Sequence, residues 1–178
     1  LMQKRMAELY WKTGIAAVEY STEEEDIRVY AGITHRLTGL LSTWTEYESA
    51  LKVAIAATER LKSLGCDTTS EYYNMLIYIG CCQSHFGLSE DNTNKSLEDA
   101  YNAQLNYIKR HAYATSYRDA IVGVINISYN FLEKGDYEKS KVWLDRMRLL
   151  IDEYGKQADA RPDYTEKQKA RYNIYLAR

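Results

Sequence analysis

The cysteines and histidines are the side chains of this sequence best suited to catalysis, and one pair has a spacing that suits a catalytic role. Cys81 lies four residues before His85, so a helix would carry both side chains on one face. A thiol beside an imidazole is the arrangement of a nucleophile and its general base. A helix interior, however, supplies neither a setting that lowers a thiol pKa nor donors for an oxyanion. We therefore expect Cys66, Cys81 and Cys82 to be small packing residues and expect no catalytic residue.

Other reaction chemistries have no matching motif. The sequence contains no His-x-x-x-His or Cys-x-x-Cys pair for zinc, no glycine-rich phosphate loop and no Gly-x-Ser-x-Gly elbow. It predicts no metal site and no cofactor, and it predicts that this fragment is not an enzyme, although a longer parent protein could be a kinase.

Composition narrows the class of protein. The chain has 178 residues, of which 46% are apolar, and its 23 basic and 25 acidic residues give a net charge of −2. This balance creates no field that attracts nucleic acid. The apolar runs are too short to span a bilayer, and no signal peptide is recognisable. The ends of the chain fall inside helical patterns, so we expect a piece of a longer protein, with its periplasmic or cytoplasmic location left open.

Apolar spacing of three and four residues predicts helices throughout, and sustained alternation, which would indicate a sheet, is missing. A single proline fits a helical chain. Pairs of Ser or Thr with an acid or amide three residues later mark expected helix starts at Thr22, Thr45, Thr68, Ser96, Ser116 and Thr165. The polar stretch 89–94 is expected to be a loop. The predicted helices cover 1–20, 22–42, 45–64, 69–87, 96–112, 116–134, 136–155 and the residues from 165 onward.

The segment around residue 135 predicts a tight turn between antiparallel helices. Gly135 can end one helix in a left-handed conformation, and Asp136 can cap the next. The residues that follow form one apolar helical face, and a similar face follows Tyr47. These faces are Tyr137, Ser140, Leu144, Met147 and Ile151, and Tyr47, Ala50, Ala54, Ala57 and Leu61.

At these positions the chain resembles a tetratricopeptide repeat protein. The best match covers residues 117–154, and the second covers 31–64. The units run longer than the family's usual repeat of about 34 residues, so another helical-hairpin solenoid or a compact bundle stays open. The resemblance implies an all-α fold in which antiparallel helix hairpins stack as a right-handed α-solenoid. The whole chain, 1–178, would be one repeat domain with units at about 22–64, 69–112 and 116–155 and a truncated unit from 165.

The resemblance also implies a concave groove, lined by the first helix of each pair, for a protein or peptide segment. Carried over by position, the groove residues are His35, Arg36, Tyr78, Cys81, His85, Asn126, Tyr129 and Glu133. The expected function is a non-catalytic protein–protein interaction module. Its expected context is bacterial signal transduction, such as a two-component sensor histidine kinase or a regulator. The alternatives are a structural or self-associating helical spacer and a domain that senses a small ligand.

Overall fold

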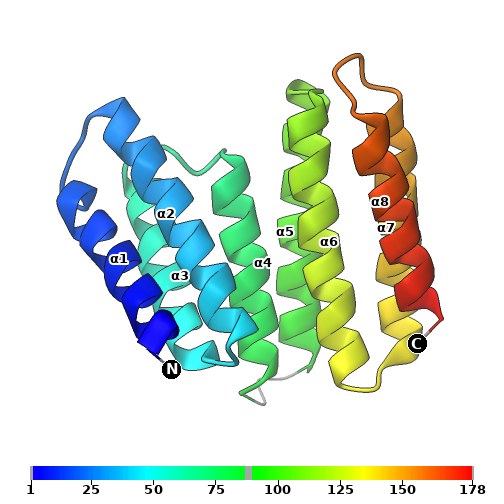
Figure 1. Cartoon of the computed structure of the whole chain (residues 1–178), viewed down its shortest axis with the longest axis horizontal. Coiled ribbons are helices and arrows are strands. Elements are labelled where there is room, and N and C mark those ends of the chain that lie inside the picture. The colour runs from blue at the N-terminus through cyan, green and yellow to red at the C-terminus, as the bar shows by residue number, and fades with distance from the viewer. Residues whose placement is uncertain (1, 87–89, 178) are drawn as a thin grey trace. The chain divides into compact units, whose positions relative to one another are not determined.

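The computed structural model describes residues 2–86 and 90–177, and these residues form eight helices and no strand (Figure 1). The all-α prediction is therefore confirmed for the described part of the chain, whereas the stacked solenoid stays a prediction. The chain divides into two compact units, residues 1–96 and residues 97–178. None of the described helices has the length and apolar content needed to cross a bilayer.

The first unit contains α1 (Met2–Val18), α2 (Glu24–Thr43), α3 (Tyr47–Ser63) and α4 (Ser70–Ser84). Successive helices pack against each other, and α4 contacts both members of the α2–α3 hairpin. The core is built around small residues of α3. Ala50, Ala54 and Ala57 are fully buried, which lets the neighbouring helices approach closely. Leu37 of α2 and Met75 of α4 fill the space beside them.

The second unit contains α6 (Ala114–Glu133), α7 (Tyr137–Gly155) and α8 (Pro162–Leu176), together with the later part of α5 (Glu90–Arg110). α7 packs against both α6 and α8. α5 is joined to α7 by Tyr101, whose ring meets Trp143 edge-on at 5.4 Å, and by the ion pair of Glu98 with Arg146. The Arg146 guanidinium also lies over the Trp143 ring, so this one cation contacts both Glu98 of α5 and Trp143 of α7.

The predicted turn at Gly135 is present. Gly135 has φ +74°, its N–H donates to the Leu132 carbonyl, and the Asp136 N–H donates to the Phe131 carbonyl. These two bonds form a Schellman ending. The Asp136 carboxylate then accepts the Lys139 N–H at 3.0 Å and caps α7, as the sequence predicts.

The hairpins α2–α3 and α6–α7 bury side chains at equivalent positions, each 90 residues apart in the sequence. Small residues occupy the first buried position of the second helix in both, where close approach of the two helices needs them. In α6–α7 this contact is polar, because the Ser128 and Ser140 hydroxyls lie 3.0 Å apart. The equivalent buried positions, with the α2–α3 residue first and the α6–α7 residue second, are Leu37 and Ile127, Thr38 and Ser128, Leu41 and Phe131, Ala50 and Ser140, Ala54 and Leu144, Ala57 and Met147, and Leu61 and Ile151.

The predicted start of α5 is wrong. The backbone is helical from Glu90, so residues 90–94 are not a loop; residues 87–89 lie outside the described part of the chain. The reason is visible in the burial pattern. Thr93 and Gln104 are buried on the same face as Leu97 and Ala100. Because these two side chains are polar, the buried face is not recognisable as an apolar pattern in the sequence.

Several predicted capping residues also differ. Thr45 follows α2 instead of capping α3, and Thr165 lies inside α8, which begins at Pro162. Proline suits this first position because its missing N–H needs no partner. α6 begins at Ala114, whose N–H bonds to the Asp159 carboxylate at 3.1 Å, so the cap comes from 45 residues away in the sequence. Thr22, Ser96 and Ser116 are not N-caps, and Thr69 takes the position expected of Thr68.

Candidate functional site

The predicted groove residues of the first unit lie on α2 and α4, except His85, which directly follows the end of α4. The His35 and Tyr78 rings are 6.0 Å apart at 48°, so these two helices meet through aromatic side chains. The Tyr78 ring also covers Gly39, where an added Cβ would come within 2.7 Å of the Tyr78 hydroxyl oxygen. Arg36 is exposed. This face is therefore largely occupied by its own side chains.

The environment of His35 favours the neutral imidazole. Burial lowers the pKa of His35 below its ordinary value, and the charge of Arg36 acts in the same direction. The carboxylate of Glu71 opposes them but has less effect than burial. A neutral imidazole in an aromatic contact is suited to packing and hydrogen bonding.

Cys81 and His85 both lie in packed surroundings within the first unit. The His85 ring is stacked on Tyr47 of α3, with centroids 3.7 Å apart and planes at 7°. Cys81 is 7% exposed and offers little surface to a ligand. Its neighbour Cys82 is fully buried, and burial raises the pKa of that thiol to about 11. A thiol with this pKa is protonated at neutral pH and is a poor nucleophile.

The predicted residues of the second unit lie along α6. Asn126 is half-buried, and Glu133 is exposed at the end of the helix. Tyr129 is 40% exposed, and its ring lies 6.3 Å from that of Tyr175 on α8. α6 and α8 therefore lie near each other at their C-terminal ends, although none of the three predicted residues lines the pocket found there.

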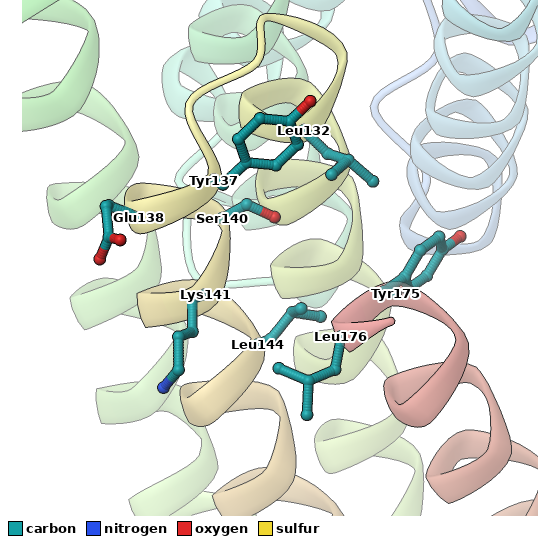
Figure 2. A pocket seen from close by; sticks show the side chains of 8 residues that line it. All are labelled: Leu132, Tyr137, Glu138, Ser140, Lys141, Leu144, Tyr175 and Leu176. Carbon is teal, nitrogen blue, oxygen red and sulfur yellow. The ribbon is translucent and has the colours of Figure 1, made fainter. Parts of the chain in front are cut away.

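That pocket lies where α6 ends, α7 begins and α8 ends, and its volume is about 290 Å³. Figure 2 shows side chains from all three helices around it. Its base contains Ser140 and Leu144 of α7, which are each only 2% exposed. The lining residues are Leu132, Tyr137, Glu138, Ser140, Lys141, Leu144, Tyr175 and Leu176.

The pocket combines an apolar wall with a charged edge. Tyr137 is 61% exposed and Leu176 is 47% exposed, so both present apolar surface to the solvent. Glu138 and Lys141 extend along the side of α7 that faces away from α8 (Figure 2). Lys141 forms an ion pair with Asp145, one turn further along α7. A ligand side chain would therefore meet an apolar surface, with charged groups beside it.

Sequence reasoning identified part of this pocket and missed the rest. Tyr137, Ser140 and Leu144 belong to the predicted apolar face of α7, and their spacing was the available signal. Tyr175 and Leu176 were not predicted, because no local pattern reveals that the end of α8 returns to the start of α7. The pocket includes a second helix of a hairpin, whereas the predicted groove used first helices only.

The described residues contain no group of three or more His, Cys, Asp or Glu side chains placed to hold a metal ion. No family model matches the chain, and comparisons with curated proteins and with solved structures found no match.

Proposed function

We propose that this chain is a non-catalytic protein-interaction module of the tetratricopeptide type, in which stacked helix hairpins form an α-solenoid. We further propose that its second unit binds a polypeptide segment through the pocket between α6, α7 and α8. The observation that carries this proposal is an apolar pocket with a buried base, Ser140 and Leu144, and exposed walls, Tyr137 and Leu176.

The size of the pocket favours a side chain over a metabolite. Small-molecule sites typically enclose about 300–1,000 Å³, so a volume of about 290 Å³ lies at the lower bound of that range. One large apolar side chain fits this space, and the surrounding backbone of a partner could lie across the edge of the pocket. Buried aromatic and aliphatic anchors of this kind supply most of the free energy at protein interfaces.

The bacterial signalling context is part of the same proposal. It is supported only by the tetratricopeptide resemblance, in which an array senses or relays while another domain acts. Self-association is a second candidate, because Ile174 and Leu176 near the end of α8 are 56% and 47% exposed. A helix surface of this kind also suits contact with a second copy of the chain.

Selection from a random peptide library on the immobilised chain tests the docking proposal. We expect the selected peptides to share one large apolar residue. We also expect Leu176→Glu, which places a charge in the pocket wall, to weaken their binding by about tenfold or more. Fluorescence anisotropy with the selected peptides measures this change.

Leu149→Glu is the matched control, because Leu149 is 60% exposed on α7 and does not line the pocket. It should leave peptide affinity within about twofold of the original. Equal loss of binding in both variants would contradict the proposed site. A different outcome would favour self-association over peptide docking. In that case no peptide is selected, and the chain forms a concentration-dependent dimer that Leu176→Glu dissociates.

A further inference from the structure

A second pocket lies at the opposite end of α6 and α8, and its lining is mainly charged. Arg118 contributes from the first turns of α6, Arg161 from the residue before α8, and Asp163, Tyr164 and Lys167 from the start of α8. The pocket encloses about 190 Å³. Arg118 is 14 residues before Leu132 on α6, so about 21 Å of helix separates this pocket from the docking pocket.

The charges in this pocket do not balance. Three cations face one carboxylate, which leaves two positive charges in excess. Asp163 already pairs with Arg161 through two bonds, Nε to Oδ1 at 3.2 Å and Nη2 to Oδ2 at 2.8 Å. Arg118 and Lys167 form no ion pair with any residue that the structure describes. No carboxylate among the described residues therefore neutralises the charges of these two cations.

Two tyrosines, Tyr154 and Tyr164, support the pocket. The Arg118 guanidinium lies over the Tyr164 ring at 5.0 Å, and the Tyr154 and Tyr164 rings are 5.0 Å apart. The Tyr154 hydroxyl accepts the Arg161 backbone N–H at 2.8 Å, which holds the start of α8 in place. Burial raises the pKa of Tyr164 despite the nearby Arg118 charge, so the ring stays neutral beneath the guanidinium. A guanidinium fixed on a ring loses less freedom on binding than a mobile one.

We propose that this pocket binds a phosphate group, either as inorganic phosphate or as a small phosphate monoester, between Arg118 and Lys167. A phosphate monoester carries about 1.5–2 negative charges at neutral pH, which is close to the excess charge of the pocket. A monocarboxylate would leave one positive charge unbalanced. The planar fork of Arg118 offers two parallel donors to a phosphate, and Lys167 adds a point charge from α8.

Titration of the ¹⁵N-labelled chain by NMR, at constant ionic strength, tests this site with two probes, inorganic phosphate and phenyl phosphate. We expect saturable shifts of the Tyr164 and Lys167 amides with at least one probe. Equal affinity for both probes identifies the free anion as sufficient, and tighter binding of phenyl phosphate identifies a monoester. Either result supports the proposal.

Three variants complete the test. Arg118→Gln and Lys167→Gln should each weaken phosphate binding by about tenfold, because each removes a charge-assisted bond. Lys167 is exposed, so its variant keeps the test valid even if Arg118→Gln impairs folding. Lys169→Gln is the control, because Lys169 pairs with Glu166 and does not line the pocket. No saturable shift with either probe, or an equal loss in Lys169→Gln, would overturn the proposal.

Discussion

Thr45 and Gly135 occupy the same position in two equivalent hairpin turns, and both have a left-handed backbone, with φ of +61° and +74°. In each turn the next residue donates its N–H to a carbonyl of the preceding helix, Glu46 to Leu41 and Asp136 to Phe131. Glycine adopts this conformation without strain, whereas a β-branched residue is disfavoured there. The first hairpin therefore contains strain that the second avoids.

Replacing Thr45 by glycine should stabilise the first unit. Relief of the left-handed strain is expected to raise the free energy of unfolding by about 1 kcal/mol. Thr45 is exposed, and its hydroxyl bonds only to the adjacent Trp44 carbonyl, so little else is lost. Urea denaturation followed by circular dichroism measures the change.

The reciprocal variant Gly135→Thr is its control and should destabilise the chain by about 1 kcal/mol. No atom lies within 4 Å of a Cβ placed on Gly135, so the added Cβ causes no clash and backbone strain is the main expected cost. If Thr45→Gly lowered stability, the equivalence of the two turns would be contradicted.

Two glycines of α2, Gly32 and Gly39, should respond differently to replacement by alanine. Alanine inside a helix is favoured over glycine by about 0.5–1 kcal/mol, so Gly32→Ala, which meets no atom within 4 Å, should stabilise by that amount. At Gly39 the new methyl group would lie 2.7 Å from the Tyr78 hydroxyl oxygen, so the ring must move and the gain is lost. Thermal unfolding of both variants measures the difference.

Removing the Tyr78 hydroxyl should recover part of the stability of Gly39→Ala, because the closest contact disappears. We expect the double variant with Tyr78→Phe to be more stable than Gly39→Ala alone. A double-mutant cycle with no coupling between the two changes would show that the contact does not limit α2.

His35 should make stability depend on pH in the mildly acidic range. Its ordinary pKa is 6.5, and burial lowers the pKa in the folded chain, so the unfolded chain binds its proton first on acidification. The free energy of unfolding should therefore fall as the pH falls below about 6.5, and His35 should contribute no slope above that value.

Urea midpoints at about pH 7.5 and about pH 5.5 measure this dependence. His35→Gln should reduce the loss between the two conditions, because its side chain does not titrate. An unchanged loss in this variant would assign the pH dependence to other groups.

The three thiols should react with iodoacetamide in an order set by burial. Cys66 is half-buried, whereas Cys81 and Cys82 are 7% and 0% exposed. The raised pKa of Cys82, about 11, further suppresses its thiolate. Mass spectrometry of timed samples should therefore show Cys66 modified first and Cys82 modified only after unfolding. Rapid labelling of Cys82 in the folded chain would contradict its burial.

Local patterns in the sequence were sufficient for much of the architecture. The apolar spacing along α7 and the Gly135–Asp136 pair determine a helix, its cap and the turn before it, because these signals act over four or five residues. The groove residues came from the tetratricopeptide resemblance, and their role stays a prediction. Local patterns fail at two threonines. Thr45 was expected to cap α3 but lies in the turn before it, and Thr93 was expected in a loop but is a buried residue of α5.

Only the tertiary structure decided which distant residues meet. Asp159 caps α6 at Ala114 and Tyr175 closes a pocket begun by Tyr137, yet nothing near either residue in the sequence specifies the partner. Helix periodicity reports which face is buried but not which helix covers it, since any apolar face of suitable shape can serve. The sequence by itself therefore determined which segments are helical and the turn at Gly135, whereas packing determined several helix ends and the pockets.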